Sequence, residues 1–298
     1  MKTITNAILI LLVTTCAIVL YAQPPATPVD AAYNQIKQQY GFIPTYMKAV
    51  PEEGVSSAWD ETQALEMSKD TALPAKMKEL IALGISAQMN CRTCIYADSQ
   101  MARASGANDR ELKEAVAQAA ITRHWSTVLN GMQIDPQAFD RETASIMTYL
   151  RQGNRPAPAA PVTDATSAYK DIQATLGTVP SFMKAFPEKA IAPAWLQMKS
   201  VELNPTTALN GKAKELIGLA VSAQIPCKYC VTFHTAAARL DGATDDEIKE
   251  AVAMAGLTRY FSTIVNGTLQ DEAQFRREID QAVKASKKAE KAPAAAQR

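Results

Sequence analysis

The sequence predicts an all-α fold built from two tandem copies of one helical domain. Positions 136 residues apart repeat one another, with 29 identities in the 58 ungapped positions that align segments 74–131 and 210–267. Apolar residues in these segments recur at helical spacing, without the sustained alternation that marks strands. The period has the size of a domain, not the roughly 20–50 residues of a solenoid repeat. Because a duplicated domain commonly replaces two subunits of an oligomer, we expect a pseudo-dimer.

Local signals place three helices in each copy. Residues 74–88 of the first copy carry an apolar stripe at helical spacing. A second helix is expected to begin near the first cysteine of each Cys-x-x-Cys pair and to stop before Gly106 or Gly242, since glycine suits the position after a helix. A third helix is expected to open at Asn108 or Thr244, because each is followed three residues later by a glutamate, as in a capping box.

Composition divides the chain into five segments. The N-terminus combines one lysine, an apolar centre and a small residue before a proline-rich stretch, which is typical of a secretory signal peptide. We therefore expect an exported protein, periplasmic or secreted, with an uncleaved membrane anchor as the alternative. The segments are a signal peptide (1–22), a first helical domain (31–151), a Pro/Ala linker (152–164), a second helical domain (165–285) and a disordered Lys/Ala-rich tail (286–298).

The bulk composition excludes some classes of partner. Hydrophobic residues make up 47% of the chain, which is ample for a sizeable core, and the formal net charge is +1. Such a charge offers no strong attraction to nucleic acid or to an acidic membrane surface. Aromatic residues make up only 6%, which also argues against surfaces that stack on bases. We expect no nucleic-acid partner.

Four cysteines remain once the signal peptide is set aside, and they form two Cys-x-x-Cys pairs. The pairs are Cys91 with Cys94 and Cys227 with Cys230. A disulfide that closes so short a loop stabilises a fold only weakly, because the effect grows with loop length. The spacing therefore indicates thiol chemistry, in which one thiol attacks and its neighbour closes the disulfide.

The second copy surrounds its cysteines with groups that can move a proton. His234 follows Cys230 by four residues, on the same face of a helix one turn away. Glu215 precedes Cys227 by twelve residues, so a hairpin of two helices can bring it back over the cysteines. A helix N-terminus and a nearby imidazolium both favour the thiolate. Glu215 can orient the imidazole or accept the thiol proton.

This pattern resembles the carboxymuconolactone decarboxylase superfamily, in its alkyl hydroperoxidase D-like branch. The resemblance covers roughly 33–150 and 169–285 and includes a Gly-x-x-Pro-x-x-x-Lys-Ala-x-Pro segment in each copy. It implies an all-helical fold, a homo-oligomer and an antioxidant enzyme of the peroxidase or peroxiredoxin type. Such an enzyme reduces hydroperoxides or disulfides and is regenerated by an external thiol reductant, such as a thioredoxin-like carrier. We expect no cofactor.

The resemblance also implies roles for the residues of the motif. In alkyl hydroperoxidase D the second cysteine attacks and the first resolves, while the glutamate and the histidine activate the thiol. The matching residues are Cys230 as nucleophile, Cys227 as resolving thiol, and Glu215 with His234 as proton relay. Thioredoxin-like chemistry uses the first cysteine as the attacker, so Cys227 stays an alternative nucleophile.

The first copy departs from this pattern at one position. It retains Glu79, Cys91 and Cys94 but has Asp98 in place of the histidine. A carboxylate supplies no positive neighbour, and a negatively charged Asp98 disfavours the thiolate of Cys94. We therefore expect the second copy to be the better catalyst and Asp98 to mark a degenerate position.

Three alternatives to thiol redox chemistry stay open. Cys227, Cys230, His234 and Glu215 are all competent zinc ligands, although zinc sites usually take such cysteine pairs from loops rather than helical repeats; we expect no metal. A second alternative is a non-enzymatic binding or assembly module with structural disulfides. The last alternative is a decarboxylase-type enzyme of the parent superfamily.

Overall fold

The computed structural model describes residues 27–153 and 161–291, which we call the first half and the second half. No strand occurs in these residues, as the sequence predicts. The helices of the first half are α1 (Pro28–Tyr40), α2 (Thr45–Lys48), α3 (Glu52–Glu61), the π-helix η1 (Thr62–Met67), α4 (Ala75–Gln88), α5 (Arg92–Ala104), α6 (Asp109–Gly131) and α7 (Pro136–Arg151). Those of the second half are α8 (Ala165–Leu176), α9 (Ser181–Ala185), α10 (Glu188–Val201), α11 (Gly211–Gln224), α12 (Lys228–Leu240), α13 (Asp245–Gly267) and α14 (Glu272–Lys291).

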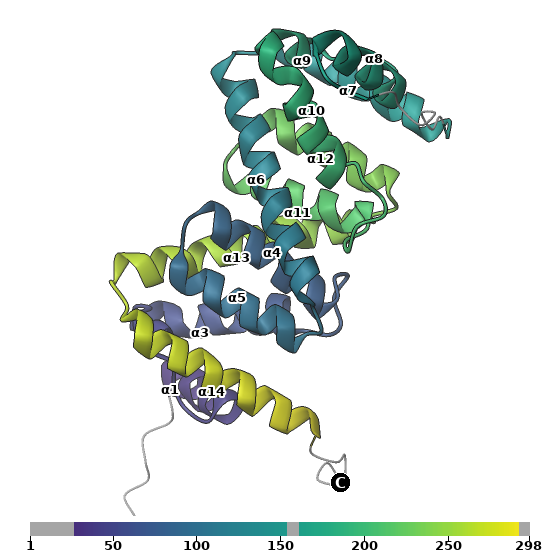
Figure 1. The fold of residues 1–298 in the computed structure, drawn as a ribbon. Coiled ribbons are helices and arrows are strands. Elements are labelled where there is room, and N and C mark those ends of the chain that lie inside the picture. The colour runs from purple at the N-terminus through teal and green to yellow at the C-terminus, as the bar shows by residue number, and fades with distance from the viewer. Residues whose placement is uncertain (1–26, 154–160, 292–298) are drawn as a thin grey trace, which may run out of the picture.

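Two equivalent helices, α4 and α11, pack against each other at the centre of the molecule (Figure 1). Both are buried along most of their length, and α6 and α13 pack against both of them. The contact is close at Gly84, where an added Cβ would lie 3.0 Å from the Cγ2 atom of Ile217. These four helices therefore form one shared core with leucine, isoleucine and alanine side chains from both halves.

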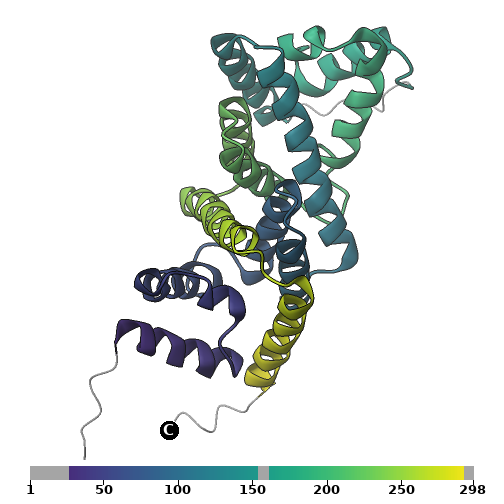
Figure 2. The ribbon, with the colours of Figure 1, turned by 90° about the vertical axis from the view of Figure 1, so that its left-hand side faces the viewer.

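The last helix of each half packs on the other half. α7 lies against α12, and α14 lies against α5 and α1, so that the yellow α14 sits beside the purple N-terminal helix in both views (Figures 1 and 2). The backbone N–H and the hydroxyl of Thr45 both donate to Glu278 of α14 at 2.8 Å. Ser181 makes the equivalent bonds to Glu142 of α7 at 3.0 Å. The expected pseudo-dimer is therefore intertwined: neither half is a closed body.

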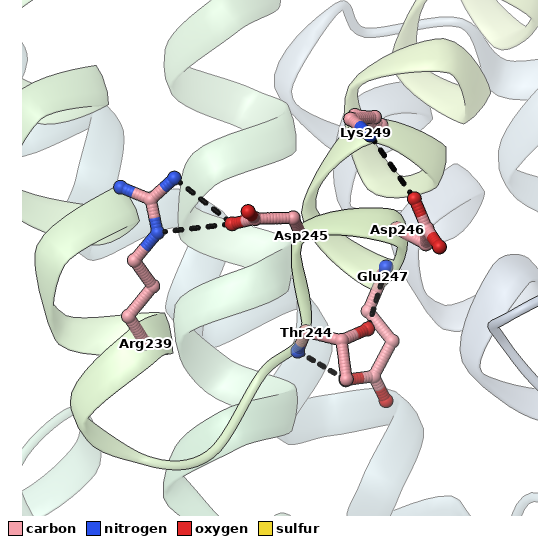
Figure 3. Close-up of polar contacts among 6 residues, drawn as sticks. All are labelled: Arg239, Thr244, Asp245, Asp246, Glu247 and Lys249. Atoms are coloured by element: carbon pink, nitrogen blue, oxygen red, sulfur yellow. Dashed lines mark hydrogen bonds and ion pairs between the residues drawn. The ribbon is translucent and has the colours of Figure 1, made fainter.

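The predicted helix limits around the cysteines are confirmed. α5 and α12 begin directly after the first cysteine of each pair, and Gly106 and Gly242 follow them with φ of +90° and +85°. Thr244 and Glu247 form the capping box of α13, and Arg239 pairs with Asp245 at 3.0 Å across the turn (Figure 3). These contacts hold the end of α12 against the start of α13, and so help to orient the helix that carries the second cysteine pair.

The ends of the predicted segments differ in part from the structure. α14 continues to Lys291, so the segment 286–298, expected to be disordered, is helical up to that residue. α7 ends and α8 begins on either side of the predicted linker, of which residues 154–160 lie outside the described residues. The predicted signal peptide at 1–22 also lies outside them. No helix within 27–153 and 161–291 is long and apolar enough to cross a membrane.

A buried lysine in each half ties loops to the shared core. The ammonium of Lys78 donates to the carbonyls of Leu65 and Ser68 at 2.6 and 2.9 Å and lies 3.2 Å from Glu250 of the other half. Glu250 also accepts the backbone N–H of Leu73 at 3.0 Å. A buried cation is costly without such partners. Lys78 and Glu250 therefore join the two halves through charge as well as through apolar packing.

Replacement of Glu250 by alanine should destabilise the fold. The change leaves Lys78 as a buried cation without its carboxylate and removes the acceptor of the Leu73 N–H. We expect the free energy of unfolding in urea to fall by about 3 kcal/mol. The control is Lys249→Ala on the same helix, where an exposed ion pair to Asp246 is lost, with an expected change below about 1 kcal/mol. Equal changes in the two variants would contradict the assigned role of Glu250.

Candidate functional site

Each cysteine pair occupies the first turn of a helix. Cys91 and Cys227 are the N-cap residues of α5 and α12, and their sulfurs accept the backbone N–H of Cys94 and Cys230, both at 3.3 Å. The sulfurs of each pair lie within disulfide-bonding distance, with Cα atoms 5.2 and 5.4 Å apart. The helix dipole and the orphan N–H groups of the first turn stabilise a negative sulfur at this place.

The two cysteines of a pair differ in what they face. Cys94 and Cys230 each line a cavity, while neither Cys91 nor Cys227 does. The latter two are fully buried, at 0% exposure, whereas Cys94 and Cys230 retain 7% and 4%. A small molecule in the cavity therefore meets the second cysteine, which is the geometry that the family resemblance implies for Cys230.

The structure brings Glu215 and His234 together beside Cys230. The Nδ1 atom of His234 lies 2.7 Å from Glu215, and both side chains are buried. Burial raises the pKa of Glu215 well above its ordinary value and lowers the pKa of His234. Both groups therefore favour their uncharged forms, and one proton is held between them. His234 is thus an uncharged imidazole that lines the same cavity as Cys230, rather than the imidazolium that the sequence predicted, and it can accept a proton at Nε2 only in the tautomer with a proton on Nδ1.

A second buried glutamate, which the sequence analysis missed, joins this pair. Glu202, at the end of α10, has a polar atom within 4.8 Å of ligand atoms of both Glu215 and His234. Burial raises its pKa to about 7, and its Oε1 atom has no hydrogen-bond partner among the described residues. The repeat contained a signal for it, because Glu66 and Glu202 precede Glu79 and Glu215 by thirteen residues in both copies.

Oxygen and nitrogen ligands of this kind can bind a divalent cation. The atoms that lie close enough together for this belong to Glu202, Glu215 and His234. They differ from the set that the sequence suggested, which contained Cys227 and Cys230. The short Glu215–His234 hydrogen bond already uses one histidine nitrogen and one carboxylate oxygen, which favours a proton relay over a metal centre.

One glycine makes room for the histidine. A Cβ atom at Gly218 of α11 would lie 2.5 Å from the Cε1 atom of His234. The equivalent position of the first half is Ala82, where the smaller Asp98 replaces the histidine. The glycine at position 218 therefore accompanies the large imidazole at position 234, and the alanine at position 82 accompanies the smaller aspartate at position 98.

The first-half site gathers carboxyl groups and no base. Asp98 accepts a hydrogen bond of 2.5 Å from Ser86, and burial raises its pKa to about 8. Burial also raises the pKa of Glu66 to about 7 and that of Glu79 well above its ordinary value. Asp98 is therefore largely uncharged at neutral pH. This corrects the expectation that a negative Asp98 opposes the thiolate of Cys94: the site lacks a base, but the aspartate adds little charge.

Residues from the other half complete each site. In the second-half site the hydroxyl of Thr122 lies 3.4 Å from the Nε2 atom of His234, and the amide of Asn130 donates to the sulfur of Cys227 at 3.4 Å. Both belong to α6 of the first half. Only the packing of the two halves shows the contact of Asn130 with a cysteine. His124, by contrast, stacks on Trp125 and Phe186.

The sequence matches the model of the carboxymuconolactone decarboxylase family at residues 53–134 and 190–269, which together exceed half of the chain. The chain belongs to this family. Both matches contain a cysteine pair with its upstream glutamate, so family membership covers both sites. No curated relative matches the sequence significantly.

The fold of this family member is also similar to a crystal structure from Burkholderia xenovorans LB400. That protein is provisionally described as a gamma-carboxymuconolactone decarboxylase subunit. The TM-score is 0.52 at 16% identity, over 89% of this chain and 100% of that chain. The similarity supports the fold alone, and the hydroperoxidase-like branch stays a prediction from the cysteine motif.

Gly218→Ala should disturb the second-half site through His234. The added methyl group overlaps the imidazole, so we expect the ring to move and the free energy of unfolding to fall by about 1–3 kcal/mol. Alkylation of Cys230, followed at neutral pH in a Cys91→Ser/Cys94→Ser background, should slow because the base is displaced. Ala82→Gly at the equivalent position is the control and should leave this rate unchanged. An unaltered rate in Gly218→Ala would contradict the assigned role of His234.

The stability of the protein should depend on pH through Asp98 of the first-half site. Its folded pKa of about 8 exceeds the unfolded value of 3.8. Folding is therefore favoured below the unfolded pKa, and this contribution is lost as pH rises through about 8. Asp98→Asn should become progressively more stable than the parent protein between about pH 5 and pH 8, with a slope of at most about 1.4 kcal/mol per pH unit.

The measurement for Asp98 is urea unfolding of the oxidised protein at several pH values. The exposed Asp60→Asn variant serves as the control and should track the parent protein. Glu66 and Glu79 titrate in the same direction in all three proteins, and the difference between curves reports Asp98 together with its repulsion of these two glutamates. Parallel curves for Asp98→Asn and the parent protein would contradict the assignment.

Proposed function

We propose that the protein is a thiol-dependent peroxidase and that its second-half site reduces small hydroperoxides with Cys230. The observation that carries the proposal is the position of Cys230: its side chain borders a cavity that His234 and Glu202 also line. Cys227 lies directly behind it, within disulfide-bonding distance. Attacking thiol, base and resolving thiol thus share one site.

The reaction begins with proton transfer from the Cys230 thiol to the Nε2 atom of neutral His234, in the tautomer whose Nδ1–H donates to the carboxylate of Glu215. The thiolate attacks the outer peroxide oxygen. An S–O bond forms, the O–O bond breaks, and the departing alkoxide or hydroxide takes the proton back from the imidazolium. Cys227 then attacks the sulfur of the sulfenic acid, which forms the disulfide and releases water.

The cavity favours a peroxide over a protein disulfide as the oxidant. It has a volume of about 40 Å³, and Cys230 is 4% exposed. A disulfide on another protein would have to bring two backbones up to this sulfur. A molecule of the size of hydrogen peroxide meets no such obstacle, so we assign the small oxidant to this site.

Each turnover leaves a disulfide, so two electrons must return from an external dithiol. Given the predicted export signal, we propose a thioredoxin-like carrier of the periplasm or the extracellular space. The alternatives are a decarboxylase activity, for which the family is named, and a structural role of the disulfides. Neither requires thiols to be consumed by peroxide, so thiol loss separates them from the proposed function.

Hydrogen peroxide should consume two thiols per protein molecule, those of Cys227 and Cys230, in a reduced variant that keeps only the second-half site. This variant carries Cys91→Ser/Cys94→Ser, and thiols are counted over time with a chromogenic disulfide. Addition of Cys230→Ser should abolish the fast loss. His234→Gln should slow it by about 100-fold, because proton transfer by a positioned base is lost.

The control is the same variant unfolded in urea, where neither the cavity nor the base exists. A folded protein whose thiols react no faster than those of the unfolded chain would overturn the peroxidase proposal. Equal loss in His234→Gln and its parent would instead remove the histidine from the mechanism and leave the thiol chemistry standing.

A further inference from the structure

The two cysteine sites open into cavities of different size. The first-half cavity, next to Cys94, has a volume of about 100 Å³. In the second half the equivalent region is divided into a cavity of about 40 Å³ next to Cys230 and one of about 20 Å³ lined by Leu176, and Phe233 lines both. The linings are equivalent: all ten residues that line the second-half cavity next to Cys230 have a counterpart 136 positions away in the first-half lining, for example Thr122 and Thr258, or Phe139 and Phe275. The difference in size therefore arises from substitutions within one shared architecture.

Three substitutions enlarge the first-half cavity. Ala97 replaces Phe233, Phe261 replaces Trp125, and Thr62 replaces Met198. Each puts a smaller side chain at an equivalent place in the wall. The change from phenylalanine to alanine is the largest and lies three residues after the second cysteine, on the same helix.

Other substitutions change the polarity of the wall. Tyr46 lines the first-half cavity where Phe182 lines the second, and Tyr40 lines it where the second half has Leu176. With Glu66, Asp98 and Glu278 they supply hydroxyl and carboxyl groups to the cavity, while Leu257, Ile279 and Ala282 line it with apolar atoms. An occupant of this cavity would have an oxygen-bearing head and an apolar body.

We infer that the first-half site binds and reduces organic hydroperoxides with bulky apolar groups, whereas the second-half site is restricted to hydrogen peroxide. A cavity of this volume is of the order that accommodates one small organic molecule. This inference rests on the proposed function and adds a division of substrates between the two sites. The loss of the histidine in the first half then accompanies a change of substrate.

In the first-half site the carboxyl group of Asp98 serves as both acid and base. The sulfur of Cys94 attacks the outer oxygen of the hydroperoxide, an S–O bond forms and the O–O bond breaks. The alkoxide that leaves takes a proton from a neutral carboxylic acid, for which Asp98 is placed, and the thiol proton passes to the resulting carboxylate. Cys91 then attacks the sulfenic acid, which forms the disulfide and releases water. An external dithiol carrier restores both thiols.

The experiment compares two single-site variants. Cys227→Ser/Cys230→Ser keeps only the first-half site, and Cys91→Ser/Cys94→Ser keeps only the second-half site. Thiol loss is followed with tert-butyl hydroperoxide and with hydrogen peroxide, and the ratio of the two rates is the readout. We expect the ratio to be at least about tenfold higher for the first-half site, the discrimination that a misfitting apolar group typically causes.

Substitutions at one equivalent wall position should change the ratio of the tert-butyl hydroperoxide rate to the hydrogen peroxide rate in opposite directions in the two single-site variants. Ala97→Phe in the first-half variant should lower it by about tenfold, and Phe233→Ala in the second-half variant should raise it. Ala120→Phe, an equal change at an exposed position of α6, is the matched control and should leave it unaltered. Circular dichroism checks the fold of each variant, and because Phe233→Ala only removes atoms, it tests the proposal even if Ala97→Phe fails to fold.

A binding measurement separates this proposal from the peroxidase proposal. Cys94→Ser/Cys230→Ser, which lacks both proposed nucleophiles, is probed with tert-butyl alcohol by ligand-observed NMR. Binding that Ala97→Phe removes and Ala120→Phe retains supports the organic site. Equal rate ratios in the two single-site variants, with no binding of the alcohol, would overturn this proposal and leave the peroxidase proposal intact. Thiols inert to both oxidants would overturn both.

Discussion

The close packing of α4 against α11 is the contact on which the rest of the structure depends. Gly84 lets α4 approach Ile217, and the two helices supply Glu79 and Glu215, the buried acids of the two sites. Both helices are covered on most sides by α6 and α13, so their polar groups must find partners inside the protein. The acids are therefore neutralised by burial rather than solvated, and the sites inherit uncharged proton donors and acceptors.

The exchange of terminal helices follows from the same packing. Because α6 and α13 cross the shared core, the helices that follow them arrive over the opposite half, where α7 covers α12 and α14 covers α5. Each cysteine pair is thus enclosed by side chains that its own repeat does not contain. The arrangement couples the two sites structurally: a substitution in one repeat alters the wall of the other repeat's cavity.

Duplication has allowed the two sites to diverge in a consistent way. In the second-half site, Gly218 admits the imidazole of His234, and Phe233 with Trp125 of the first half closes the cavity around it. In the first half, Ala82 and Asp98 occupy the equivalent places, and Ala97 opens the wall. Family membership explains why the two sites share the same helices and cysteine pairs. The side chains at equivalent positions differ, and they give the two sites different chemical environments. A neutral aspartate hydrogen-bonded to Ser86 is a proton donor, whereas a neutral histidine is a proton acceptor.

The sequence by itself determined the helical fold, the duplication, the start of α5 and α12 at Cys91 and Cys227, and the meeting of Glu215 with His234. These features depend on local periodicity, capping and short separations along the chain, which a repeat displays twice. Only the tertiary structure decided which half supplies the walls of each site, as for Thr122 and Asn130, because contacts across some hundred residues leave no local pattern. The charge of Asp98 also had to come from the structure, since the pKa of a carboxyl group depends on its burial and its neighbours rather than on its place in a motif.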